Sequence, residues 1–436
     1  MSAQIGVEPR PVVHVESAHA LPLVSISVSF RTGALHDPEG KEGLARFTAR
    51  MLRRGTQKRS SRALEAAIDS LGGELSVEVS VSTVSVHAQV IRRNLEPFLD
   101  LLAEFLGQPA FAEDELEKFR REVLAELIEV RDNDRALAQL AFRKHMFAGH
   151  PFGRSTHGRP RTIEAIRVED VRDFYSSHFT RGNAVFGFAQ DVRRDEAERI
   201  AARLRDAIPE ASTPEIALGP PPRLAGRRLI FVDKPERTQT QIQIGALGTS
   251  PHDEDHVPLA VAVAIFGGTF TSRLMKEIRS KRGWSYGASA RIAIERQRHA
   301  FSMSTFPAAA DAAPCLALEL SMLEQLVADG VTARETSFAR NYLVRSHAFE
   351  IDTAPKRLQQ ALDVDLLDLP PDYHTRYLPR VRQTTSQAAT LALKSRLFPE
   401  ELVIVVVGTA SEILDAVQKS IPRLAGTCVL PFDSDD

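Results

Sequence analysis

The residues from Phe266 to Gly287 read FGGTFTSRLMKEIRSKRGWSYG and are the most informative stretch of this chain. Gly267 and Gly268 follow an apolar helical segment, and glycine permits the left-handed backbone with which many helices end. Thr271 or Ser272 can cap a second helix, because a side-chain hydroxyl accepts from a free backbone N–H of the first turn. The stretch therefore predicts two helices separated by a tight turn, followed by a strand that Tyr286 opens.

Outward from this block, the chain divides into two halves with the same order of elements. A stretch rich in Pro, Gly and Ala, residues 208–228, predicts a linker between the halves 1–207 and 229–436. In each half an alternating strand is followed by a helix, a strand pair and long helical regions. The sequence thus predicts an α+β protein of two duplicated halves, each with helices packed on a mostly antiparallel sheet. The alternative is a pair of unrelated α+β domains.

The corresponding segments of the two halves have closely similar lengths. The opening strands are expected at 23–31 and 238–246, their helices at 43–54 and 257–266, and the long helical regions at 113–146 and 334–366.

Composition excludes several classes of protein. The chain has 436 residues, of which 43% are hydrophobic and 26% charged, with 55 Lys and Arg against 57 Asp and Glu. This balance disfavours nucleic acid as a partner, and no apolar run is long enough to span a membrane. Cys315 and Cys428 cannot build a disulfide framework. Met1–Ala20 lacks the features of a signal peptide, so we expect a cytoplasmic protein, or a periplasmic one if the N-terminus is processed.

The block at 266–287 resembles the second half of the pitrilysin-type zinc peptidases, the inverzincin family. Nearly the full chain shares the resemblance, since His150-Pro151-Phe152-Gly153 is similar to a family His-Pro-Tyr-Gly segment. The resemblance implies that Arg279 and Tyr286 form a pair. The tyrosine hydroxyl would donate to the scissile carbonyl as it becomes an oxyanion, and the arginine would hold the substrate main chain. Without the resemblance, the two residues would be an ordinary surface arginine and a half-buried strand aromatic.

The first half keeps the sequence frame of the family's zinc motif but not its chemistry. Residues 43–52 read GLARFTARML where the family has His-x-x-Glu-His. Arg46 and Arg50 replace the two histidines, and Ala49 replaces the glutamate that acts as general base. A guanidinium stays charged and has no lone pair for a metal. The sequence therefore predicts no metal or other cofactor in this chain.

The family's third zinc ligand is a glutamate on a later helix, and Glu126 lies at the matching distance along the chain. We expect Arg46 or Arg50 to pair with Glu126, so that an ion pair replaces the metal site. The alternative is that Glu122, Glu126 and Glu129 form a solvated stripe on that helix.

The resemblance implies the zinc-less subunit of a heterodimeric metallopeptidase, of the small bacterial and mitochondrial-processing-peptidase-like branch. The chain would be inactive alone and would form half of a clam-like chamber around an unfolded peptide. A homologous partner with His-x-x-Glu-His would supply Zn²⁺ and the base, and the family's interfaces also allow a homodimer of this chain. One alternative is a non-enzymatic scaffold or peptide-binding protein of the same fold. The other is a self-contained hydrolase with a different site, for instance near His252 and His256, although the turn at 252–256 is more typical of a solvated loop.

Overall fold

The computed structural model describes residues 12–214 and 216–434, so the first eleven residues of Met1–Ala20 lie outside the described part. The contacts between Cα atoms divide the chain into two compact units. Both units draw on separated segments. The first comprises 1–125, 155–217 and 350–368, and the second comprises 126–154, 218–349 and 369–436.

The first unit is built on a five-stranded mixed sheet with the strand order β1-β5-β2-β4-β3. β1 pairs with β5 in parallel, and the remaining neighbours are antiparallel. In β2 the apolar residues Val24, Ile26, Val28 and Phe30 alternate with serines, and this period of two is typical of a β-strand. The strands are β1 Val12–Ser17, β2 Leu23–Phe30, β3 Glu74–Val79, β4 Val84–Ile91 and β5 Ala184–Gln190.

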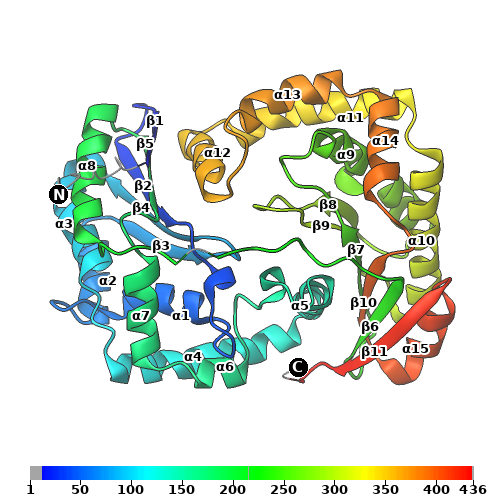
Figure 1. Cartoon of the computed structure of the whole chain (residues 1–436), viewed down its shortest axis with the longest axis horizontal. Helices are drawn as coiled ribbons and strands as arrows, with labels where there is room; N and C mark the ends of the chain where they lie inside the picture. Colours follow the sequence, from blue (N-terminus) through cyan, green and yellow to red (C-terminus); the bar gives the residue numbers. More distant parts are fainter. Residues whose placement is uncertain (1–11, 215, 435–436) are drawn as a thin grey trace, which may run out of the picture. The chain divides into compact units, whose positions relative to one another are not determined.

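Helices cover both faces of this first sheet at β5, whose residues are nearly all buried. Val185 and Ala189 pack against α12, and Gly187 between them lies close to Leu358 of that helix. Figure 1 shows α3 and α8 on the other side of the sheet. The helices of this unit are α1 Leu44–Met51, α2 Ser61–Ser70, α3 Leu95–Gly107, α6 Pro160–Glu164, α7 Val168–His178, α8 Arg194–Ala207 and α12 Ala354–Leu366. Helix α4, Glu113–Asp132, begins in the first unit and ends in the second.

The second unit contains a six-stranded mixed sheet with the order β11-β6-β10-β7-β9-β8. β10 is fully buried along its length, as expected for a strand covered on both faces. Helix α5 packs on β7 and β10, and Figure 1 shows α10 and α15 beyond the opposite face. The strands are β6 Arg227–Asp233, β7 Gln241–Leu247, β8 Ala288–Ile292, β9 Ala300–Thr305, β10 Leu402–Gly408 and β11 Leu424–Pro431. The helices are α5 Asp134–Met146, α9 His256–Val263, α10 Ala312–Asp329, α11 Ala333–Ser346, α13 Tyr373–Gln383, α14 Ser386–Arg396 and α15 Ala410–Lys419.

The two sheets share one topology. Without β11, the second order β6-β10-β7-β9-β8 repeats the first order β1-β5-β2-β4-β3 strand for strand in chain sequence. The equivalent helices α5 and α12 are exchanged, since α5 packs on the second sheet and α12 on the first. The predicted α+β class, with helices on a mostly antiparallel sheet in each of two similar parts, is confirmed.

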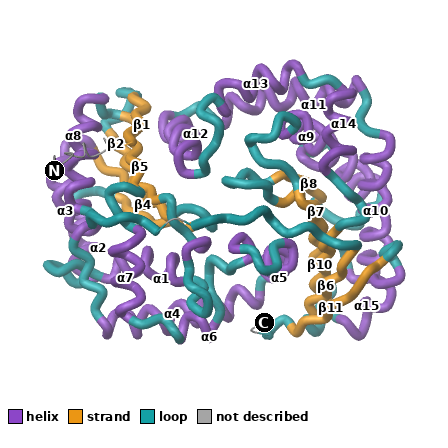
Figure 2. The backbone as a smooth tube through the Cα atoms, in the orientation of Figure 1, coloured by secondary structure: helices purple, strands orange, loops and turns teal. Residues whose placement is uncertain are grey.

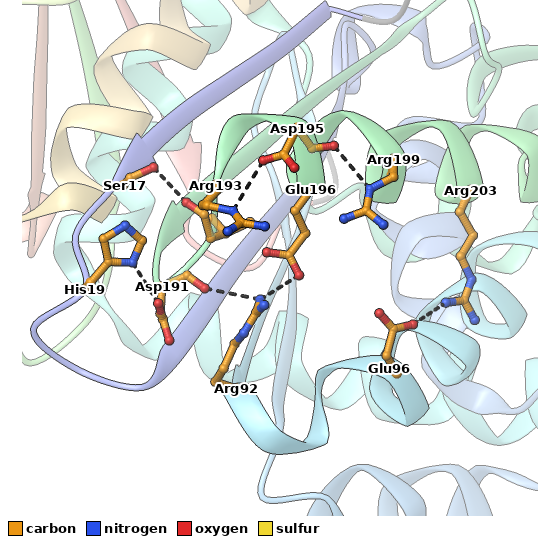
Figure 3. A network of polar contacts seen from close by, with 11 residues as sticks. Ser17, His19, Arg92, Glu96, Asp191, Arg193, Asp195, Glu196, Arg199 and Arg203 are labelled. Atoms are coloured by element: carbon orange, nitrogen blue, oxygen red, sulfur yellow. Dashed lines mark hydrogen bonds and ion pairs between the residues drawn. The ribbon is translucent and has the colours of Figure 1, made fainter.

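A polar network lies beside the β1–β2 turn and the start of α8 (Figure 3). His19 Nδ1 lies 2.7 Å from the Asp191 carboxylate. Arg92 Nη1 lies 2.7 Å from the carboxylate of Glu196 and donates to the Asp191 carbonyl at 3.3 Å. These contacts join the residues that directly follow β4 and β5 to α8 at the surface, where each ion pair contributes about 0–1 kcal/mol.

The expected linker at 208–228 largely lacks regular structure. The described residues between α8 and β6 contain no helix or strand (Figure 2). Residues 1–207 and 229–436 remain predicted as sequence halves, whereas the compact units are defined by contacts and exchange a helix. No helix in the described ranges combines the length and apolarity needed to cross a bilayer.

Candidate functional site

Helix α1 carries the three positions of the altered zinc motif, and its start is fixed by Asp37. The buried Asp37 carboxylate accepts hydrogen bonds from the backbone N–H groups of Gly43 and Ala45, both at 2.7 Å. A negative charge is favourable at this end of a helix. Gly43 has φ of 97°, and a Cβ there would lie 2.8 Å from the Gly158 Cα. The backbone frame around 43–52 is therefore strongly constrained.

The arginines of this motif lie near a buried aromatic ring of α4. Arg50 Cζ and Arg54 Cζ each lie 4.7 Å from the ring centroid of Phe119, which is fully buried. Arg46 and Arg50 line a crevice together with Phe119 and His157. A guanidinium over an aromatic face gains a cation–π attraction. The Arg50 and Arg54 guanidiniums thus pack against an aromatic ring.

Arg54, which the sequence reasoning did not consider, forms an ion pair with Glu122 of α4. Its Nη1 donates to the Glu122 carboxylate at 3.0 Å. The spacing was a usable signal, because Arg54 follows Arg50 by four residues and so continues its helical face. The expected pairing of Arg46 or Arg50 with Glu126 stays a prediction.

The side chains at the motif do not fit a zinc ion. Arg46 and Arg50 offer no lone pair, and Ala49, which has no exposed surface, offers no carboxylate to activate water. Within the described ranges, no group of three or more His, Cys, Asp or Glu side chains is arranged to hold a metal. No catalytic step of this chain can therefore be routed through zinc at these positions.

In the second unit, the block at 266–287 contains two π-helical segments, η5 Ala264–Gly268 and η6 Met275–Lys281. The helix expected after Thr271 is present, and Ser272 Oγ accepts from the Met275 N–H at 3.4 Å, while residues 275–281 have the wider π geometry. π-Helical turns frequently mark functional sites. Gly267 is required at the first of them, since a Cβ there would lie 2.4 Å from the backbone N of Ala290 in β8.

The expectation that Tyr286 opens a strand is wrong, since β8 begins at Ala288. The backbone just before β8 is held by hydrogen bonds of the Ser285 side chain and not by strand pairing. Ser285 Oγ donates to the Gly287 carbonyl at 2.7 Å and accepts from the Phe306 N–H at 3.1 Å. This small loop fixes the backbone beside Tyr286, and the Tyr286 side chain is 76% exposed.

Arg273, in the middle of the 266–287 block, has a structural role. Its Nε and Nη2 donate to the two carboxylate oxygens of Glu335 at 2.8 Å, and Nη2 also donates to the Gly330 carbonyl at 3.0 Å. The Arg273 guanidinium and the Thr332 cap lower the pKa of Glu335 to about 2. Because Glu335 lies in the first turn of α11, this bidentate pair ties the block to that helix.

Arg279 and Tyr286, which the family resemblance pairs, lie in contact. Arg279 Cζ lies 4.1 Å from the Tyr286 ring centroid and 4.8 Å from that of Phe270. The Phe270 side chain is 71% exposed. In the described part of the chain, neither a carboxylate nor another acceptor is bonded to the Arg279 guanidinium. The sequence reasoning missed Phe270, although an apolar residue in a polar turn was a signal.

The segment 252–256 was expected to be a solvated loop, but its last residue, His256, is buried. His256 is 3% exposed, and its two ring nitrogens are hydrogen-bonded to Thr249 Oγ1 at 2.9 Å and Tyr373 OH at 3.1 Å. Burial lowers the pKa of His256 to about 4. Asp253 and Asp255 pair with Arg396. These contacts give the segment a structural role and disfavour an independent hydrolytic site there.

Sequence comparison adds the decisive observation for the family. Residues 12–159 match the family described as "Insulinase (Peptidase family M16)", and residues 165–343 match "Peptidase M16 inactive domain". The chain belongs to peptidase family M16.

Relatives of this M16 protein include both peptidase subunits and proteins named as inactive. The chain is 21% identical to the "Non-peptidase homolog YmxG" of Helicobacter pylori, over 91% of each chain. It is 25% identical to the "Probable mitochondrial-processing peptidase subunit beta" of Arabidopsis thaliana, over 58% of this chain and 48% of the relative. A solved structure from Pseudomonas fluorescens, titled "peptidase M16 inactive domain", aligns with a TM-score of 0.85 at 23% identity, over 97% of each chain.

These matches confirm the family that the sequence predicted. The name of the relative YmxG, which denotes a non-peptidase, agrees with the altered motif. The description "inactive domain" refers to the second half of the chain, residues 165–343, and the altered motif lies in the first half. The M16 chain described here is therefore a family member whose own motif lacks the family's metal ligands at Arg46 and Arg50.

Proposed function

We propose that this chain is the zinc-less subunit of a heterodimeric M16 peptidase that hydrolyses unfolded peptides. A homologous partner with an intact His-x-x-Glu-His motif would supply the zinc ion and the general base. One contrast carries the proposal. The metal-ligand positions Arg46 and Arg50 have lost their chemistry, whereas Arg279 and Tyr286 are kept side by side with their polar groups available.

The two retained side chains suit an oxyanion and a peptide main chain. The Tyr286 hydroxyl would donate to the scissile carbonyl oxygen as negative charge develops there. The Arg279 guanidinium would donate to a neighbouring main-chain carbonyl of the peptide. Both groups are hydrogen-bond donors, and removal of one such donor typically costs about 10²–10³ in rate. A chain that served only as a scaffold would not need both donors in an exposed position.

The proposal is tested by co-expression of this chain with the homologue from the same source that has the motif. We expect the isolated chain to be inactive and the complex to cleave an unfolded peptide. Tyr286→Phe should lower kcat by about 10²-fold with assembly unchanged by analytical ultracentrifugation. The control is Tyr342→Phe on α11, because Tyr342 is 43% exposed and is not in contact with Arg279. Normal turnover in Tyr286→Phe would reject the assigned role.

A non-enzymatic scaffold or peptide-binding protein of the same fold is a second candidate. The name of the relative YmxG, "Non-peptidase homolog", favours it. It predicts that every pairing with a homologue is inactive toward peptides, or that Tyr286→Phe changes peptide affinity without any turnover to lose. Peptide hydrolysis by the complex that depends on Tyr286 would exclude this candidate.

A further inference from the structure

We propose that Phe270 is a positioning residue for Arg279, holding the guanidinium through its aromatic face so that the N–H donors stay available to the substrate. The part that concerns substrate rests on the proposed function above. The packing of the two side chains does not depend on it.

The three arginines of the block use their donors differently. Arg273 donates hydrogen bonds to the Glu335 carboxylate and the Gly330 carbonyl. Arg282 lies over Trp284 at 5.4 Å, but its Nη1 donates to Glu277 at 2.6 Å. Glu277 is also bonded to Lys281, so the nearest carboxylate of η6 already has cationic partners. Of the three guanidiniums, that of Arg279 alone has no acceptor among the residues that the structure describes.

What fixes Arg279 instead is its contact with two exposed rings. Its Cζ lies 4.8 Å over Phe270 and 4.1 Å over Tyr286. A cation–π contact attracts the guanidinium without using any N–H donor. It therefore restricts a long side chain, and so lowers the entropic cost of binding, while every donor can still reach a carbonyl or carboxylate.

Phe270 is well placed for this role and poorly placed for a role in the core. It lies in the short turn between η5 and η6, and η6 carries Arg279. Its ring is 71% exposed and lies outside the hydrophobic cluster of this unit's described residues. Substitution of Phe270 should therefore change the Arg279 contact more than the stability of the fold.

The first experiment needs no enzymatic activity. The rate at which phenylglyoxal modifies Arg279 is measured by mass spectrometry on the full chain. We expect Phe270→Ala to raise this rate about two- to fivefold, as expected for the loss of an exposed cation–π contact, and Phe270→Tyr to leave it unchanged. Arg282 provides an internal reference, because its contacts with Trp284 and Glu277 are intact in each variant. Equal Arg279 rates in the Ala variant and the parent protein would overturn the inference.

The second experiment uses the complex with the motif-bearing partner. Phe270→Ala should lower kcat/KM about two- to fivefold. Phe270→Tyr should keep the parent value. Phe270→Leu should lower kcat/KM as Phe270→Ala does, because leucine is apolar but has no π face. Phe338→Ala, at a 54% exposed phenylalanine of α11, is the matched control. The positioning role would be overturned if Phe270→Leu and Phe270→Tyr had equal kcat/KM, or if Phe270→Ala kept the full kcat/KM of the parent complex. If the parent complex cleaves no peptide, the proposed function fails and the labelling rates alone decide this inference.

Discussion

The ring of Phe142 in α5 lies directly against Gly245 in β7. A Cβ on Gly245 would lie 2.4 Å from the Phe142 Cζ and 2.5 Å from the Phe301 carbonyl oxygen of the neighbouring strand β9. Helix α5 comes before the linker in sequence, yet this contact belongs to the second unit. The absence of a side chain at one position thus lets a helix from the first sequence half pack on the second sheet.

Gly245→Ala should therefore destabilise the protein. The methyl group cannot fit unless the Phe142 ring and the β9 backbone both move, and such overpacking typically costs about 1–3 kcal/mol. Urea unfolding followed by circular dichroism measures the change. Gly219→Ala is the control, because a Cβ there meets nothing within 4 Å. Equal midpoints for the two variants would contradict the close packing of α5 on β7.

Arg273→Ala should weaken the attachment of the 266–287 block to α11. Loss of a bidentate charged hydrogen bond costs about 1.5–3 kcal/mol at neutral pH. The pKa of Glu335 in the folded state, about 2, is below its unfolded value of 4.5. Its contribution is therefore present above pH 4.5 and is lost as the pH falls toward 2.

The measurement for Arg273 is the free energy of unfolding between pH 2 and pH 7. The difference between the parent protein and Arg273→Ala should be largest at pH 7 and shrink below pH 4.5. Lys419→Ala, which removes an exposed pair with Asp415 on α15, should change stability by less than about 0.5 kcal/mol. A constant difference for Arg273→Ala over the whole range would exclude the ion pair as its cause.

The buried Glu319 should make the protein less stable as the pH rises from about 4.5 to about 8. This α10 side chain has no exposed surface, accepts from Thr305 Oγ1 at 3.1 Å, and has an unpartnered Oε1. Burial raises its pKa to about 8 in the folded protein, above 4.5 in the unfolded chain. The folded state then binds one more proton between these values, so stability falls with rising pH, by up to about 1.4 kcal/mol per pH unit.

Glu319→Gln should abolish this slope between pH 5 and pH 8. Thermal unfolding at several pH values measures it, since the amide keeps the shape of the side chain but does not titrate there. Glu39→Gln is the control, because Glu39 is an exposed glutamate in a loop before α1. A slope that persists unchanged in Glu319→Gln would assign it to another group.

Zinc uptake tests the altered motif directly. After incubation with zinc and desalting, the purified chain should retain less than about a tenth of an equivalent, because the side chains at 46, 49 and 50 donate no lone pair to a metal. Elemental analysis gives the value. A full equivalent would reveal a site elsewhere in the chain, and the self-contained hydrolase would then become the leading explanation.

Local pattern was sufficient for many elements. Alternation of apolar residues predicted strands at 23–31 and 238–246, and the structure has Leu23–Phe30 and Gln241–Leu247. The strands Val12–Ser17 and Leu424–Pro431 were not among the predictions. They lie at sheet edges, and each is formed by pairing with a strand far away in the sequence, β5 or β6. Periodicity within a short edge strand carries little of that information.

The candidate site divides in the same way. The identities of Arg46, Ala49 and Arg50 were enough to remove the zinc chemistry, because the absence of lone pairs is a property of the side chain itself. The proximity of Arg279 and Tyr286 followed from the family resemblance. The contact of Phe270 with Arg279 was not predicted, because the two residues are nine positions apart and only the folded turn brings their side chains together. The linker boundaries, the pairing with Glu126 and the cytoplasmic location stay predictions.

The sequence by itself determined the α+β class, the repeated order of elements, the family and the loss of the metal ligands, since these follow from residue type and local periodicity. The tertiary structure alone decided that α5 and α12 are exchanged between the units, and that Arg273 is saturated by Glu335 whereas Arg279 keeps its donors. The physical reason is that packing and hydrogen-bond saturation depend on atoms brought together from distant segments. Two arginines six positions apart can therefore have opposite roles.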